Sequence, residues 1–377
     1  MGAKRVGGTV SPAQPHQEGV TETSVSVEMG ASKTVPPAST REETSSLQRT
    51  QLPQKISARQ GCCAMMKKIT GTMSPITKAK LTELAHAGIS IGTSSWKYPR
   101  WCGQLYDEQR YLTRKKFSKA KFEATCLEEY AQTFHTVCVD AGYYKFPSEQ
   151  WLTKLCTPVP ANFRFSFKVT DTITIKHFAN LPRHGSFAGK RNDHFLSAEM
   201  FRSSFLRPCE PFREHIGVLI FEFSQFHQRD FERGGDFVAA LDAFLGELPR
   251  DWQYAVEIRN RNFLHPEYFA MLRGHGVAHV FNSWSRMPPV SEQMALPDSI
   301  TTDFCAARFL LTPGRTYEKA VAEFSPYAET KAVDPDARAA GRELIAKAKA
   351  EKRGSFIYVN NRLEGNALRT IEAMLES

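Results

Sequence analysis

Two acidic residues stand inside apolar segments of this chain, where a charge needs a partner or a function. Glu222 lies in the run Val-Leu-Ile-Phe-Glu-Phe, and Glu257 lies in Tyr-Ala-Val-Glu-Ile. An unpaired carboxylate in apolar surroundings is strongly destabilised, so each must be paired, protonated or placed at the edge of the core. A third carboxylate, Asp140, ends another apolar run. Carboxylates on neighbouring strands can serve as general acid and base, and these three are the predicted catalytic residues.

Basic side chains occupy similar positions and permit a second interpretation. Arg259 follows Glu257 by two residues, Lys168 ends a further apolar run, and Arg308 lies within another. These cations could bind the anionic group of a ligand, because a guanidinium matches the oxygens of a carboxylate or phosphate. They could equally form structural ion pairs, for example Glu222 with Arg259 or Lys168. The sequence leaves both interpretations open.

Uncharged polar and aromatic residues complete the predicted substrate-binding set. They stand at the ends of the same apolar runs or in the loops that follow them, where amides could orient a substrate and aromatic rings could wall a pocket. Hydroxyl groups beside aromatic rings suit a sugar-like or nucleoside-like ligand. The set comprises Ser95, Trp96, Tyr98, Tyr144, Asn282, Asn360 and Asn361. Trp101, in the same loop as Trp96, is expected to be a hydrophobic plug.

Metal binding has weaker support. Asp140, Glu222 and Glu257 could supply oxygen ligands, but no histidine has the spacing that would complete a site. His279 stands in an apolar run and is expected to be a buried core histidine. The eight cysteines contain no CxxC pair, which disfavours a zinc site. The sequence therefore predicts no metal and no cofactor.

The composition is that of a folded protein with a basic surface. The chain has 377 residues, of which 41% are hydrophobic and 11% aromatic, and its formal net charge is +9. This charge favours anionic partners, either a small molecule or nucleic acid. Nucleic acid is not favoured, because no stripe of Lys and Arg alternates with aromatic residues. The oligomeric state is not indicated.

Targeting signals are not apparent, so a cytoplasmic location without membrane insertion is expected. No run of eighteen apolar residues exists, and the N-terminal region lacks the apolar centre of a signal peptide. Residues 1–73 are rich in Ser, Thr, Pro, Gly and Gln, a composition typical of a disordered tail.

The elements that must position these side chains form a repeating pattern over residues 74–377. Eight short apolar strands are predicted at 89–93, 136–140, 163–169, 216–223, 253–258, 277–282, 304–309 and 355–360. Amphipathic helices are predicted at 74–88, 118–134, 237–248, 266–273, 335–352 and 363–375. Alternating strands and helices of this number predict a single α/β domain, a (β/α)₈ TIM-type barrel whose catalytic groups lie at the carboxyl ends of the strands. Two long segments, 170–195 and 283–302, interrupt the pattern; the first is basic and contains glycine, and the second is rich in Pro and Met and shows no clear helix.

Several motifs at the strand ends are similar to those of the YecE-like proteins, known as domain of unknown function 72. They are Gly-Thr-Ser-Ser-Trp-Lys-Tyr at 92–98, Thr-Val-Cys-Val-Asp at 136–140, Phe-Arg-Phe-Ser-Phe-Lys at 163–168, Val-Glu-Ile-Arg at 256–259 and Val-Asn-Asn at 359–361. The resemblance covers about residues 89–377 and implies a TIM barrel, but no activity. This chain resembles a distinct branch, with Cys138 and Asp140 where many members carry Glu and Asn, and Glu222 where many carry Gln.

Two functions fit these observations. The first is an enzyme that acts by acid/base chemistry on a small hydroxylated anionic molecule, such as a sugar phosphate, a sugar acid or a nucleotide-like compound, by hydrolysis, lyase chemistry or isomerisation. The alternative is a non-catalytic binding protein that uses its basic surface for nucleic acid or another macromolecule. In that case the glutamates would be locked in salt bridges, and the basic segment 170–195 would carry the function.

Overall fold

The computed structural model describes residues 72–376 and shows a closed barrel of eight parallel strands. The strands are β1 (Ile89–Thr93), β4 (Thr136–Val139), β5 (Arg164–Lys168), β6 (Ile216–Phe223), β7 (Tyr254–Ile258), β8 (Ala278–Ser283), β9 (Phe304–Phe309) and β10 (Gly354–Val359). They neighbour one another in chain order, and β1 closes the barrel by pairing with both β10 and β4. All eight predicted strands and the TIM-type fold are confirmed, each strand end within one residue of the prediction.

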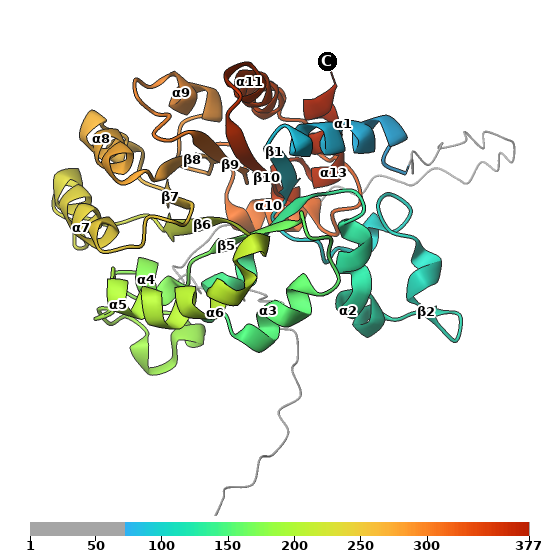
Figure 1. Ribbon diagram of the computed structural model, residues 1–377, viewed down its shortest axis with the longest axis horizontal. Coiled ribbons are helices and arrows are strands. Elements are labelled where there is room, and N and C mark those ends of the chain that lie inside the picture. Colours follow the sequence, from blue (N-terminus) through green and yellow to red (C-terminus); the bar gives the residue numbers. More distant parts are fainter. Residues whose placement is uncertain (1–71, 377) are drawn as a thin grey trace, which may run out of the picture. The chain divides into compact units, whose positions relative to one another are not determined.

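Helices lie around the outside of the strands (Figure 1). The longer ones are α1 (Pro75–His86), α2 (Lys119–Tyr130), α3 (Glu149–Cys156), α7 (Gly234–Gly246), α8 (Pro266–His275), α10 (Tyr317–Phe324), α11 (Pro335–Glu351) and α13 (Ala367–Leu375). Shorter ones are α4 (Asp171–Thr174), α5 (Ala198–Met200), α6 (Arg207–Cys209), α9 (Val290–Ala295) and α12 (Asn361–Glu364), and β2 (Leu112–Thr113) and β3 (Lys116–Phe117) form a small hairpin. None of these helices, in the part of the chain that the structure describes, is long and apolar enough to cross a membrane.

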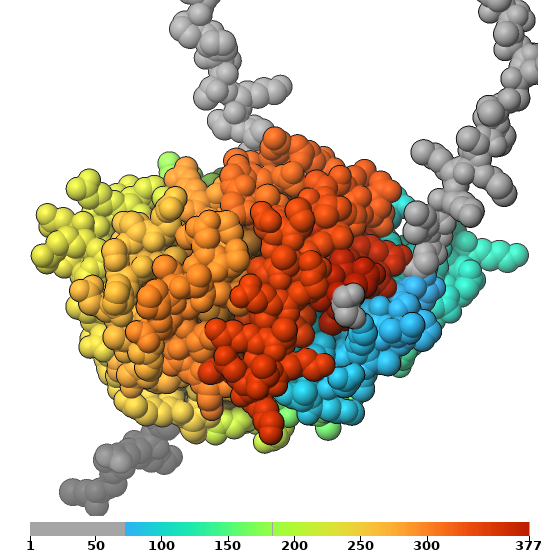
Figure 2. Space-filling view, turned by 90° about the horizontal axis from the view of Figure 1, so that it is seen from above, coloured from blue at the N-terminus to red at the C-terminus, as the bar shows by residue number. Residues whose placement is uncertain are grey.

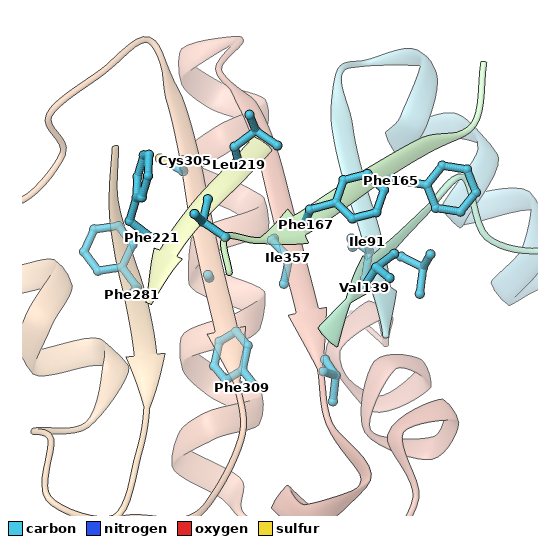
Figure 3. Close-up of a cluster of buried hydrophobic side chains, with 14 of the residues drawn as sticks. Ile91, Val139, Phe165, Phe167, Leu219, Phe221, Phe281, Cys305, Phe309 and Ile357 are labelled. Atoms are coloured by element: carbon cyan, nitrogen blue, oxygen red, sulfur yellow. The ribbon is translucent and has the colours of Figure 1, made fainter. Parts of the chain in front are cut away.

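The two faces of each strand carry different residues because side chains alternate along an extended chain. Outward residues pack against the helices in one large apolar cluster. Figure 3 draws part of it, including Ile91, Phe167, Phe221 and Ile357 from different strands. Inward residues form a second, smaller cluster, which contains Cys138, Val218, Ile220, Ala255, Ala278, Val280, Phe304, Ala306 and Tyr358. The barrel interior is thus filled by side chains up to the level where the strands end.

The barrel closes where β1 meets β4, and a glycine makes this approach possible. A Cβ atom on Gly92 would lie only 2.2 Å from the carbonyl oxygen of Thr136. No side chain fits at that distance, so a glycine is required where the first and second barrel strands come together.

The N-terminal helix α1 packs on the outside of the barrel beside α13 and joins the two ends of the folded region. The Ser355 N–H donates to the Gly88 carbonyl 2.9 Å away, and Lys80 Nζ donates to the Leu375 carbonyl at 2.8 Å. Figure 2 shows the blue α1 segment against the red C-terminal segment. Met73 was assigned to the tail but is buried, and its N–H donates to the Gln104 carbonyl. The folded region therefore begins before residue 74; the rest of the predicted tail lies outside the described residues.

The two irregular segments are more ordered than the sequence indicated. Segment 283–302 contains helix α9, so the expectation of no helix there is wrong. The side chain of Gln293 in α9 accepts from the Asn282 N–H and donates to its carbonyl, which fixes the helix to the end of β8. Segment 170–195 contains α4, and Asn192 Nδ2 donates to the carbonyls of Thr172 and Ile175.

Candidate functional site

Six charged side chains converge where the strands end. Lys168, Glu222, Glu257 and Arg308 are inward positions of β5, β6, β7 and β9, and Asp140 and Arg259 directly follow β4 and β7. Inward positions alternate with core residues, so these charges stand one step beyond the inner apolar cluster. The structure therefore brings together all three predicted catalytic residues and the three predicted cations, which we call the charged layer.

Glu222 contacts every cation of the charged layer. Its Oε2 lies 2.7 Å from Lys168, 3.0 Å from Arg259 and 3.1 Å from Arg308. Burial alone would raise the pKa of Glu222, but the three cations together lower it well below the ordinary value. Conversely, burial lowers the pKa of Lys168, while Glu222 and then Asp140 raise it above its usual range. Glu222 is a permanently ionised carboxylate at neutral pH.

Glu257 and Arg308 form the centre of the charged layer. Glu257 is fully buried, with Oε2 2.6 Å from Arg308 and Oε1 2.9 Å from Arg259. Arg308 also contacts Glu222 and Asp140, so one guanidinium touches all three carboxylates. Burial opposes the charge of Arg308, but the carboxylates, Glu257 foremost, raise its pKa further. The three carboxylates and three cations sum to zero charge.

Asp140 differs from the two glutamates in exposure and in the strength of its contacts. Its side chain is 36% exposed, against 4% for Glu222 and 0% for Glu257. Its Oδ1 lies 3.3 Å from Arg308 and 3.9 Å from Lys168. Of the three predicted catalytic carboxylates, Asp140 is the one that a ligand from solvent can reach.

Aromatic rings cover two of the cations. Lys168 Nζ lies 3.9 Å from the ring centre of Tyr143, and the Arg259 guanidinium lies 3.6 Å from that of Trp284. Such contacts are favourable, more so where water is excluded. The sequence analysis selected Tyr144 instead of Tyr143 and did not select Trp284. Each follows a strand closely, but alternation does not extend into loops and could not identify them.

The predicted asparagines already have structural hydrogen bonds. Asn282 Nδ2 donates to the carbonyls of Ile258 and Val280, while its buried Oδ1 has no hydrogen-bond partner in the described chain. Asn360 caps α12 by accepting from the Arg362 N–H, and Asn361 Oδ1 accepts from the Ala367 N–H at 2.7 Å. These hydrogen bonds cap a helix or join neighbouring segments of the backbone, which are structural roles.

The predicted residues of the β1 loop lie at different depths. Trp96 is buried and its carbonyl accepts from the Tyr106 hydroxyl, whereas Ser95 is half-buried. Trp101 is fully buried, which confirms its role as a plug. The Tyr98 ring is tilted by 43° against that of Trp101, with the ring centres 4.6 Å apart, and burial raises the pKa of Tyr98 to about 12. Tyr144 is 55% exposed.

A second polar group lies around Arg362, which the sequence analysis did not select. The Arg362 guanidinium lies 4.6 Å from the ring centre of Tyr317 and within hydrogen-bonding reach of the Tyr327 hydroxyl. Tyr98 packs edge-on against Tyr327 at 5.8 Å. We call these four residues the arginine–tyrosine cluster. They come from three distant parts of the chain, namely the loop after β1, helix α10 with the turn that follows it, and helix α12, so no sequence pattern links them.

A cavity of about 700 Å³ lies between the loops that follow β6 and β7, and none of the predicted site residues lines it. Its walls include His227, Asn260 and His265. The Asn260 side chain is already bonded to the backbone of Phe226 through both its oxygen and its nitrogen. Within residues 72–376, no group of three His, Cys, Asp or Glu side chains could hold a metal ion. His279 is buried beside Tyr268, as expected of a core histidine, and burial lowers its pKa to about 4.

Comparison with known proteins agrees with this architecture. The UPF0759 protein YecE of Escherichia coli strain K12 is 27% identical over 183 residues, and the match covers 48% of this chain and half the length of that relative. A DUF72 family protein from Thermotoga maritima superposes with a TM-score of 0.51 at 19% identity, covering 76% of this chain and 99% of its own. One from Enterococcus faecalis gives 0.51 at 18% identity, covering 76% and 95%. The family described as "Protein of unknown function DUF72" matches residues 90–377. This chain is a member of the DUF72 family.

Proposed function

We propose that this chain is an enzyme that acts on a small, hydroxylated, anionic molecule at the carboxyl end of the barrel, with Asp140 as its acid/base residue. One observation carries the proposal. Asp140 is the exposed carboxylate in a layer whose other two carboxylates are buried. Groups at the carboxyl ends of barrel strands are where barrel enzymes carry their chemistry.

The two glutamates act as positioning residues in this proposal. Glu222 and Glu257 hold Arg259 and Arg308 through contacts of 2.6–3.1 Å. A carboxylate that is surrounded by cations is a weak base and does not take up a proton at neutral pH. The buried pairs fix the direction of the guanidinium groups, as a preorganised site requires.

Asp140 is suited to proton transfer because two cations lie on one side of it and solvent lies on the other. Arg308 and Lys168 approach the same oxygen, Oδ1. The carboxylate remains 36% exposed and can accept a proton from a substrate hydroxyl, a C–H group or a water molecule on its solvent side. Lys168 and Arg308 would stabilise negative charge that develops near Asp140. Hydrolysis, lyase chemistry and isomerisation all need this step.

The first test is a search for the ligand. We would screen the full chain for thermal stabilisation by phosphorylated sugars, sugar acids and nucleotides. A ligand at a hundred times its Kd stabilises the folded state by about 2.7 kcal/mol, which raises the Tm measurably. No hit from a broad panel with folded protein would favour the macromolecular alternative, in which the exposed Lys190 and Arg191 of segment 170–195 bind the partner.

The second test separates catalysis from binding. Asp140→Asn keeps the size of the side chain and removes the base, so turnover of the ligand should fall by roughly a hundredfold or more, with binding retained. As a control, Asn360→Asp can be added to the Asp140→Asn variant. It places a carboxylate at another strand end and should not restore turnover, because that carboxylate is not the proposed base. Unchanged turnover in Asp140→Asn would remove Asp140 from the mechanism.

A further inference from the structure

Arg362 is a cation without a counterion. Within residues 72–376, no carboxylate oxygen lies within 4.0 Å of its guanidinium, and its Nε is buried without a hydrogen-bond partner. The cations of the charged layer, Lys168, Arg259 and Arg308, each contact at least one carboxylate. A shielded, uncompensated guanidinium is costly unless an anion binds to it.

The tyrosines around Arg362 supply hydrogen-bond donors and remain partly exposed. Tyr98, Tyr317 and Tyr327 are all half-buried, as is Arg362. Burial raises the pKa of Tyr98 to about 12, so its hydroxyl keeps its proton at neutral pH. A neutral phenol can donate a hydrogen bond to an anion, and the guanidinium adds a planar set of further donors.

The number of donors favours a phosphate group over a carboxylate. A carboxylate has two oxygens, and a guanidinium can satisfy both by itself. A phosphate monoester has three terminal oxygens with up to two negative charges, so it can use Arg362 and the hydroxyls of Tyr98 and Tyr327 together. The six charges of the charged layer cancel, so this layer supplies no net negative charge to compensate Arg362.

The arginine–tyrosine cluster is connected to the charged layer. Tyr317, which stacks on Arg362, and Trp284, which stacks on Arg259, both pack on the apolar cluster of Leu311, Ala320 and Phe324. Asp140 lies close enough to raise the pKa of both Arg362 and Tyr98, after larger effects of burial and nearer groups. The charge of Asp140 therefore acts on both groups of residues.

We infer that the arginine–tyrosine cluster is a subsite for the phosphate group of a phosphate monoester whose hydroxylated end reaches Asp140. The position of the hydroxylated end rests on the proposed function, whereas phosphate binding at Arg362 does not. The inference therefore narrows the substrate class from anionic molecules in general to phosphorylated, hydroxylated ones.

Inorganic phosphate is the probe, titrated calorimetrically into the full chain in a low-chloride buffer. The wild-type protein should bind one phosphate, and Arg362→Gln should weaken binding by roughly ten- to a hundredfold, as expected for charge-assisted hydrogen bonds. Tyr98→Phe and Tyr327→Phe should each weaken it by about two- to tenfold. Arg286→Gln is the matched control. Arg286 is exposed and donates to Gln225, so its loss removes the same charge and should leave the affinity unchanged.

Each other result overturns the assignment. The subsite is excluded if wild-type protein does not bind phosphate at millimolar concentration, or if Arg362→Gln and Arg286→Gln weaken binding equally. Should Arg362→Gln not fold, the two Tyr→Phe variants decide, and unchanged affinity in both rejects the subsite. Asp140→Asn keeps the arginine–tyrosine cluster intact and should bind phosphate at least as well as wild type. If phosphate still binds but Asp140→Asn leaves turnover unchanged, the proposed function is rejected and the phosphate subsite is not.

Discussion

The interior of the barrel holds two polar layers of opposite character. The charged layer at the carboxyl end has ion pairs of 2.6–3.9 Å. One step deeper, the polar groups are neutral hydroxyls: Tyr358 donates to Ser166 at 2.5 Å and lies 2.8 Å from the Thr136 hydroxyl. Ser166 in turn accepts from the Val218 N–H. Both layers are buried, but only the upper one contains groups with full charges.

This difference indicates that the stability of the fold alone does not explain why the charged layer contains charged residues. A neutral hydroxyl network that satisfies its own hydrogen bonds is compatible with a stable core. A buried ion cluster is often no more stable than apolar residues of similar size, because taking charges out of water offsets their attraction. The charges stand at the end that is open to ligands, which favours a functional reason for them.

The largest expected effect tests whether the charged layer is one interlocked unit. Arg308→Met removes the guanidinium that touches all three carboxylates and leaves them with two cations. Breaking a buried ion pair on one side typically destabilises a protein by about 3–5 kcal/mol, and urea unfolding would measure it. Lys319→Met should cause no measurable change, because Lys319 is 64% exposed in its pair with Glu323. Equal free energies of unfolding for Arg308→Met and Lys319→Met would contradict the interlocking of the charged layer.

The second expected effect is a dependence of the free energy of unfolding on pH, which should come from the charged layer and not from the hydroxyl layer. The pKa of Glu222 is lowered in the folded state, so below its ordinary value of 4.5 the unfolded chain binds more protons. The stability from Glu222 is therefore present above about pH 4.5 and is lost as the pH falls below that value.

Unfolding free energies at pH 7 and pH 4 would show this dependence. The difference between the two pH values should be smaller in Glu222→Gln than in wild type. Tyr358→Phe, in the neutral layer, should keep the wild-type difference. If Glu222→Gln shows the full wild-type dependence, Glu222 is not the carboxylate that the cations hold ionised.

The smallest effect is expected in the hydroxyl layer. Tyr358→Phe removes one hydroxyl, and Ser166 and Thr136 can still bond to Val218 N–H and the Arg164 carbonyl. We expect a loss of about 1 kcal/mol in the free energy of unfolding at neutral pH. A loss as large as that of Arg308→Met would show that the two layers contribute alike.

The sequence predicted the barrel and most of the charged layer because both depend on alternation within strands. Tyr254, Val256 and Ile258 alternate with Glu257, so their apolar character indicates that Glu257 points inward, and these three residues do pack in the outer cluster. The contacts of Glu222 with Lys168 and Arg259 were among the predicted alternatives. Side chains alternate between the two faces of a strand, so the position of a residue in the pattern tells which face it lies on. Its burial could therefore be inferred from the sequence.

Features that depend on loop geometry could not be predicted. Trp284 and Arg259 lie on irregular backbone, and Tyr317 and Arg362 lie in short helices whose placement depends on the preceding loops. The mutual cancellation of six charges also needs distances that no sequence gives. Helix α9 was not predicted because it is short and prolines precede and follow it. Its position is fixed by the hydrogen bond of Gln293 to the Asn282 carbonyl, which the sequence does not show.

The shared contacts of the charged layer restrict how this protein can evolve. Arg308 touches three carboxylates and Glu222 touches three cations, so a change at either position alters the charge balance of every other member. Neutral drift of one position at a time is thereby disfavoured, and substitutions are expected to covary. Cys138 lies close enough to Arg308 for its charge to affect the thiol, whose pKa burial raises to about 12. A carboxylate introduced at position 138 would therefore be expected to act on the same arginine and to require a compensating loss of negative charge elsewhere in the charged layer.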